Sequence, residues 1–210
     1  MHQDGIIYRS MVWLTRLAYL NILWIVFSLL GLLAVGFFPA TIAMFAVERK
    51  WIRGNTSFAI LPYFWVVYKN NFKQANVIGF PFVLLFILIY FNLYFTQVMN
   101  HFIGNLFFFF LFAILFLVAI VFLYVFPTYI HYDVRMIESI IFSFIIAFSA
   151  PLQTFLILVN LFGFFIITLY LPGVFFLFVG SATSLIIMWF AYRAMTQIKN
   201  RKELILRHEK

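Results

Sequence analysis

Long apolar runs alternate along this chain with short stretches that hold nearly all of its charge. Residues 17–47 carry no charged side chain, and residues 76–192 carry only Asp133, Arg135 and Glu138. A charge at the centre of a bilayer costs at least about 2.5 kcal/mol on insertion scales, so such runs indicate segments that lie in lipid. The pattern predicts an all-α, polytopic helical membrane protein whose single integral-membrane domain covers residues 1–210.

About 20 apolar residues are needed for a helix to cross the roughly 30 Å hydrocarbon core of a bilayer. The polar and turn-forming stretches leave room for about five such spans, near residues 20–45, 77–97, 106–126, 140–160 and 174–192. Gly36 and Pro39 favour a kink or a break near the end of the first span, with a short helix over 40–51 after it. A re-entrant hairpin is the alternative there. Pro151 predicts a kink inside the fourth span.

Basic residues fall almost entirely on one side of the predicted membrane. The loop 48–75, the short connection around Asp133 and the tail 193–210 share that side, and only Arg9 and Arg16 of the 14 basic residues lie elsewhere. By the positive-inside rule, we expect the C-terminus to be cytoplasmic and the N-terminus to lie outside the cell membrane. An interfacial N-terminal helix is the alternative, because aromatic residues flank the two arginines: Tyr8, Trp13 and Tyr19.

Composition supports the membrane assignment and removes other classes. Of the 210 residues, 66% are hydrophobic and 10% are charged, which is too much apolar surface for a water-soluble fold to hide. The net charge of +8 therefore indicates orientation and contact with anionic lipid headgroups at the basic loop and tail, rather than nucleic-acid binding. The chain has no cysteine, which excludes disulfides and thiolate metal sites. The first apolar run exceeds a signal-peptide core, so we expect this segment to be retained.

The predicted cytoplasmic loop contains an amphipathic helix over residues 57–74. Its aromatic and apolar residues recur at three- and four-residue intervals and so share one face, whereas its basic residues gather near its end. This is the composition of a helix that lies in the headgroup plane. Whether it only rests at the interface or also docks the cytoplasmic part of a partner is left open by the pattern. The candidate residues for partner or lipid contact are Trp65, Tyr68, Lys69, Asn71, Phe72, Lys73 and Gln74.

Three short stretches carry a family resemblance: Asn21-Ile-Leu-Trp24, then Gly36-Phe-Phe-Pro39-Ala40-Thr41, then Tyr68-Lys-Asn-Asn-Phe-Lys-Gln-Ala75. Together with the length and span spacing of nearly the whole chain, they resemble the YesL-like family, small polytopic proteins of mostly Gram-positive bacteria with a domain of unknown function. The chain departs from the family's usual Leu-Pro pair at the end of the first span. Members tend to be encoded beside carbohydrate ABC transporters and two-component regulators, so the resemblance implies an accessory role in sugar uptake or its sensing.

Catalytic chemistry is not indicated. The four histidines are scattered, no metal-ligand spacing or nucleophile motif occurs, and no ionisable residue lies inside a predicted span. We therefore expect no catalytic residue, no cofactor and no metal. Pairs of small residues, Ser143 with Ala147 and Gly180 with Ser184, predict that the fourth and fifth spans pack together or form a homo-oligomer face. The candidate kink or packing residues are Gly36, Pro39, Thr41, Pro151, Gly180 and Ser184.

These patterns predict a non-enzymatic accessory or regulatory membrane protein associated with a carbohydrate ABC transporter or its sensor. The alternative is a small secondary transporter or channel for a neutral solute, in which the helix breaks serve as binding points. A lipid-interacting scaffold is a third interpretation.

Overall fold

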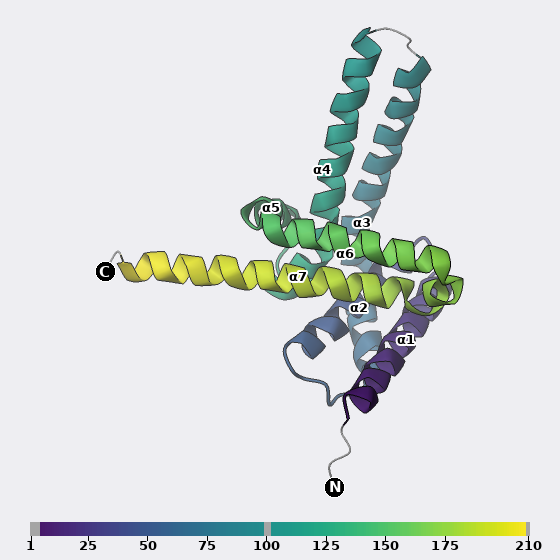
Figure 1. Cartoon of the computed structure of the whole chain (residues 1–210), viewed down its shortest axis with the longest axis vertical. Helices are drawn as coiled ribbons and strands as arrows, with labels where there is room; N and C mark the ends of the chain where they lie inside the picture. Colours follow the sequence, from purple (N-terminus) through teal and green to yellow (C-terminus); the bar gives the residue numbers. More distant parts are fainter. Residues whose placement is uncertain (1–4, 99–101, 209–210) are drawn as a thin grey trace.

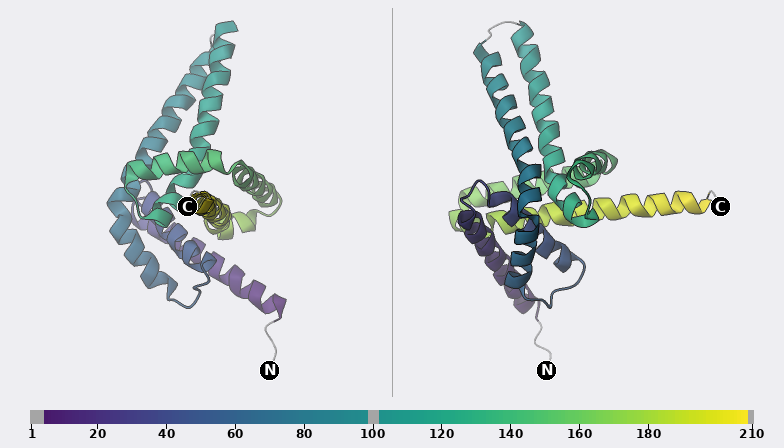
Figure 2. Two further views of the ribbon diagram at one scale, coloured as in Figure 1. Left: turned by 90° about the vertical axis from the view of Figure 1, so that its left-hand side faces the viewer. Right: turned by 180° about the vertical axis from the view of Figure 1, so that it is seen from behind.

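The computed structural model describes residues 5–98 and 102–208, which form helices without any strand. The helices are α1 (Ile6–Leu30), α2 (Phe37–Ile52), α3 (Ile60–Val98), α4 (Phe102–Tyr132), α5 (Met136–Ser149), α6 (Pro151–Tyr170) and α7 (Pro172–His208). Figure 1 shows α3 and α4 as a hairpin that stands out from a helical body. In the body, α6 and α7 lie side by side and run across the base of the hairpin, an arrangement that the two views of Figure 2 also show.

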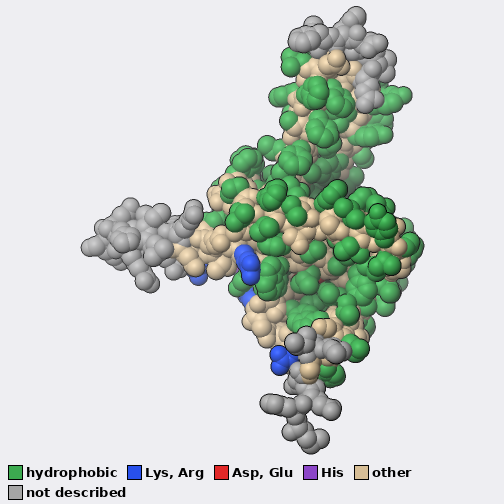
Figure 3. All heavy atoms as spheres, in the orientation of Figure 1, with side chains coloured by type: hydrophobic (Ala, Val, Ile, Leu, Met, Phe, Trp, Pro, Cys, Tyr) green, Lys and Arg blue, Asp and Glu red, His purple; other side chains and the backbone are tan. Residues whose placement is uncertain are grey.

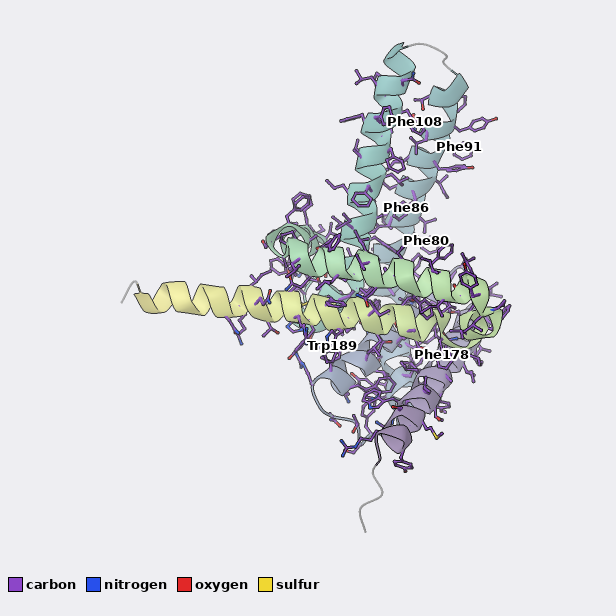
Figure 4. All side chains as sticks on the ribbon, viewed as in Figure 1. Phe80, Phe86, Phe91, Phe108, Phe178 and Trp189 are labelled. Atoms are coloured by element: carbon purple, nitrogen blue, oxygen red, sulfur yellow. The ribbon has the colours of Figure 1, made fainter. Side chains whose placement is uncertain are left out.

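Five of the helices are long and apolar enough to cross a membrane. These stretches are Tyr8–Leu30, Ile60–Thr96, Gly104–Tyr132, Pro151–Tyr170 and Pro172–Asn200. Their outer surfaces expose many large hydrophobic side chains, which is unusual for a water-soluble protein. Phe109 on the hairpin, for example, is 69% exposed. Figure 3 shows apolar side chains over the hairpin and α6, and the labelled Phe86, Phe91 and Phe108 of Figure 4 lie along the hairpin. The prediction of an all-α polytopic membrane protein with about five spans is confirmed.

The first predicted span is divided. Helix α1 ends at Leu30, and α2 starts at Phe37 after a turn that brings Gly31 against Gly36. A Cβ atom on Gly36 would lie 2.6 Å from the Ser28 carbonyl oxygen, which explains why this position lacks a side chain. Leu32 and Leu33 adopt the left-handed conformation, with φ of 57° and 56°, so the turn is strained for L residues.

Helix α3 joins two elements that the sequence placed separately. The predicted interfacial helix and the second span form one helix of 39 residues, because no helix breaker separates them around residue 75. Pro62 lies in its first turn, where proline is tolerated. At 1.5 Å per residue the helix is roughly 58 Å long, about twice the hydrocarbon thickness. The helix is therefore longer than one crossing of the hydrocarbon core requires, and the excess length is enough to leave its charged N-terminal part outside that core.

Pro151 divides the fourth predicted span instead of kinking it. Ala150 leaves helical geometry, with φ −128° and ψ 61°, because a proline lacks the N–H for an intrahelical bond and disfavours the α conformation of the residue before it. Helix α5 has 14 residues and is too short to cross lipid. The fourth candidate span is therefore residues 151–170, about ten residues later than the predicted 140–160.

Helix α2 is the centre of the body and contacts α1, α3, α4 and α7. One face contributes Ile42 and Phe45 to a core with the bases of α3, α4 and α7. Another face packs Ala43 and Trp51 against α1 and the start of α3. A helix of 16 residues thus connects the apolar run to the basic loop.

Candidate functional site

The N-terminal part of α3 has one buried face and one exposed face. Phe64 and Tyr68 are buried against α1, and the Tyr68 hydroxyl donates a hydrogen bond of 3.1 Å to the carbonyl oxygen of Phe27. Trp65 is 48% exposed, and Lys69 and Lys73 are exposed beside it. The aromatic side chains expected to share one lipid-facing surface are therefore split, because α1 offers a protein core for half of them.

The amide side chains of the same stretch hold α3 in place. The Tyr129 hydroxyl of α4 donates to the Asn71 side-chain oxygen at 2.8 Å and also contacts the Gln74 side-chain oxygen. The Asn76 amide donates to the carbonyl oxygen of Val35 at 2.9 Å, in the turn between α1 and α2. Phe72 is half-buried beside Tyr68. Of the candidate contact residues, Tyr68, Asn71, Phe72 and Gln74 thus make internal contacts.

We call Trp65, Lys69 and Lys73 the α3 docking face; Trp65 is half-exposed and also packs on Phe27 of α1 and on Tyr68, at 5.6 and 6.0 Å between ring centroids. They recur every four residues, so they lie in one row along the helix. Because the contacts of Tyr68 and Asn71 hold this part of α3 in place, the three side chains have a defined spacing. Their role in binding a partner or lipid stays a prediction.

The small residues of α7 contact α1 and α2 instead of the fourth span. The backbone N–H groups of Gly180 and Ser181 donate to the Asn21 side-chain oxygen at 2.9 and 3.2 Å, and the Asn21 amide donates to the carbonyl oxygen of Phe176 at 2.9 Å. A Cβ atom on Gly180 would lie 2.7 Å from the same Asn21 oxygen. The fourth and fifth spans do pack together, as α6 against α7, but Ser143 and Ala147 lie outside this contact, in α5, which packs mainly on α4.

Glu48 is the functional candidate that the sequence reasoning missed. Its side chain is fully buried, the Ser184 hydroxyl donates to its Oε1, and Oε2 has no hydrogen-bond partner among the described residues. The residue follows the uncharged run directly, so the charge pattern assigns it to the loop. Glu48 follows Phe45, Met44 and Thr41 by three, four and seven residues, so on a helix it shares their face. This spacing was the signal in the sequence that Glu48 points inward.

A cavity of about 280 Å³ lies between α1, α2, α4 and α7, and its lining is mainly apolar. Its polar groups come from Trp24, Thr41, Thr183 and Ser184. The indole N–H of Trp24 donates to the Thr41 hydroxyl at 3.0 Å. The candidates Thr41, Gly180 and Ser184 therefore line one cavity. Pro39 is buried in the first turn of α2, and Pro151 starts α6 on the surface.

Metal binding finds no support in the described part of the chain, where no group of three or more metal-ligating side chains occurs. The predicted tail extends past the described residues, so Lys210 lies outside them.

Comparison with known proteins places the chain in a family. The model of the family "Protein of unknown function, DUF624" matches residues 17–93. Three uncharacterized Bacillus subtilis (strain 168) proteins are similar: YesL, 35% identical over 91% of this chain and 90% of its own, YteU, 33% over 95% and 90%, and YesV, 31% over 85% and 86%. No solved structure matches the chain with statistical significance. The long similarity to YesL and its two relatives, together with the five apolar helices, shows that the chain belongs to the YesL-like family of DUF624 membrane proteins.

Proposed function

We propose that this protein is a non-enzymatic accessory or regulatory subunit that binds a carbohydrate ABC transporter or its membrane sensor. The observation that carries the proposal is the α3 docking face. Lys69 and Lys73 are exposed and Trp65 is half-exposed against Phe27 and Tyr68, on a helix that Tyr68 and Asn71 hold in place. A surface that is ordered before binding loses less conformational freedom when a partner docks.

The chemistry of the docking face defines the kind of segment it fits. Tryptophan is enriched among residues that dominate binding energy, and the two lysines attract a segment with acidic side chains. Residues 69 and 73 are one helical turn apart, so they match carboxylates spaced one turn apart on a partner helix. The fit is to an acidic cytoplasmic helix or loop of a transporter or sensor subunit. The link to carbohydrate transport comes from the family resemblance.

Co-purification from native membranes after mild cross-linking tests the proposal. We expect the wild-type chain to retain a subunit of a carbohydrate ABC transporter or its sensor, and Lys69→Glu with Lys73→Glu to lose it. The matched control reverses two exposed charges outside the docking face, Arg9→Glu with Arg193→Glu, and should keep the partner. The proposal is refuted if the chain emerges alone, or if both double variants retain the partner equally.

A small transporter or channel for a neutral solute is the second candidate, and the cavity beside the α1–α2 break favours it. Its volume of about 280 Å³ is close to the lower end of ligand pockets, and Trp24, Thr41 and Ser184 supply hydrogen-bonding groups to it. Solute uptake by proteoliposomes above that of empty vesicles would support transport. Equal uptake would exclude it for the solutes assayed.

A further inference from the structure

A second, larger cavity lies where α2 and α4 end beside α5 and α7. Its volume is about 650 Å³, and it has two chemically different walls. Arg53 and Lys199 make one wall basic, and the imidazole of His131, which burial and these like charges keep neutral, lies on the same wall. Phe142 and Ile145 of α5 form an apolar wall and are 37% and 47% exposed. The cavity is separate from the α3 docking face.

Positive charge is crowded at the basic wall. Arg49 lies behind it and donates a hydrogen bond to the carbonyl oxygen of Ile130 near the end of α4. Burial lowers the pKa of the Arg49 guanidinium and the like charge of Arg53 lowers it further, whereas Asp133 acts in the opposite direction. An arginine nevertheless stays charged in proteins. The like charges of Arg49 and Arg53 thus repel each other beside this wall, and an anion bound there would relieve the repulsion.

His131 adds an unsatisfied polar atom on the same wall. Its ring packs edge-on against Tyr192 at 5.4 Å between centroids, and its buried Nδ1 has no hydrogen-bond partner among the residues described. A buried polar atom without a partner is uncommon in folded proteins. The cavity therefore offers positive charge from Arg53 and Lys199 beside a polar imidazole.

Arg53 is held at the cavity by the backbone that follows α2. It is the C-cap residue of that helix, and its N–H donates to the carbonyl oxygen of Arg49. Gly54 follows with φ of 86°, a left-handed conformation that glycine adopts without strain, and turns the chain away. The side chain thus starts from a fixed point beside the ends of α2 and α4.

We propose that this cavity binds an anionic phospholipid, with the phosphate at Arg53, His131 and Lys199 and the first part of an acyl chain along Phe142 and Ile145. A free anion would use only the basic wall, whereas a lipid uses both. Basic pockets between transmembrane helices on the cytoplasmic side bind lipid headgroups in this manner. The site goes beyond the proposed accessory role, because it needs no protein partner.

Native mass spectrometry of the purified chain, titrated with phosphatidylglycerol or phosphatidylcholine, tests the site. We expect saturable binding of phosphatidylglycerol only. Removing one charge should weaken binding roughly fivefold, so Arg53→Gln with Lys199→Gln should weaken it roughly 30-fold. The matched control Lys69→Gln with Lys73→Gln removes the same charge from the α3 docking face and should bind as the wild type does. Equal loss in both double variants, or no saturable binding, overturns the proposal.

Two further measurements separate a lipid from a free phosphate and from a folding defect. Phe142→Ala with Ile145→Ala should weaken phosphatidylglycerol binding, and inorganic phosphate should fail to displace the lipid. Displacement by phosphate would instead assign the cavity to a soluble anion and refute the lipid proposal. On the unaltered chain, a photoactivatable phosphatidylglycerol should label α5 or α7 at the cavity. Labelling confined to other helices would contradict the site even if the variants misfold.

Discussion

The turn between α1 and α2 makes a sharp prediction for Gly36→Ala. A Cβ atom there would lie 2.6 Å from the Ser28 carbonyl oxygen, 2.8 Å from Gly31 Cα and 2.8 Å from the Phe27 carbonyl oxygen. All three neighbours are backbone atoms, so no side chain can rotate to make room. The substitution must push α1 and α2 apart.

The expected loss of stability follows from these contacts. Overpacking of this kind typically costs about 1–3 kcal/mol. The Phe27 carbonyl also accepts the 3.1 Å hydrogen bond of Tyr68, and losing that bond adds about 0.5–1.5 kcal/mol. We therefore expect Gly36→Ala to lower the free energy of unfolding by roughly 2–4 kcal/mol.

Thermal unfolding in detergent, followed by circular dichroism, measures this loss. A chain of this length loses roughly 2–4 °C in Tm per kcal/mol, so we expect a Tm lowered by about 4–16 °C. The matched control is Gly163→Ala in α6, where an added Cβ meets no atom within 4 Å. Alanine is the better helix former by about 1 kcal/mol, so this control should be neutral or stabilising. If the Tm of Gly36→Ala equals that of Gly163→Ala, the close approach of Gly31 and Gly36 is refuted.

Three further substitutions test internal contacts by the same unfolding assay. Asn21→Ala removes three hydrogen bonds to the α7 backbone, each worth about 0.6 kcal/mol in a membrane, and should lower the free energy of unfolding by about 2 kcal/mol. The control Asn160→Ala breaks only a hydrogen bond within its own helix and should lower it much less. Tyr129→Phe should cost about 0.5–1.5 kcal/mol by removing the one hydroxyl proton that the Asn71 and Gln74 side-chain oxygens share; no change would contradict that anchor. Glu48→Gln keeps an acceptor for its serine donor and removes a buried carboxyl, so stability should be unchanged or raised; a marked loss would show that the carboxylate itself is needed.

The membrane class and the number of long apolar helices were predictable because both depend on composition along the chain. A run without charge, such as residues 17–47, has to be shielded from water by lipid or by protein whatever its neighbours are. The residues at which the helices begin and end were less predictable. Pro151 is compatible with either a kink or a break, and the choice depends on how α5 packs against α4.

The candidate site was predictable only in outline. The helical spacing of residues 57–74 identified an amphipathic helix, but it could not show that α1 covers Phe64 and Tyr68 while Trp65 stays exposed. Glu48 was missed because a charge pattern places every carboxylate in water. Only the tertiary contacts show that this one is buried. The basic cavity joins Arg53 and His131, at the ends of α2 and α4, with Lys199 of α7, a proximity that no local pattern contains.

Site-specific photo-cross-linking in living cells tests the accessory role most directly. A photoreactive amino acid is placed at position 69 or 73 on the α3 docking face, and at position 163 on α6 as the control, and captured proteins are identified by mass spectrometry. We expect positions 69 and 73 to capture a subunit of a carbohydrate ABC transporter or its sensor, and position 163 not to capture it. An absence of protein adducts at positions 69 and 73, or the same adducts at all three positions, would contradict a docking role for this face.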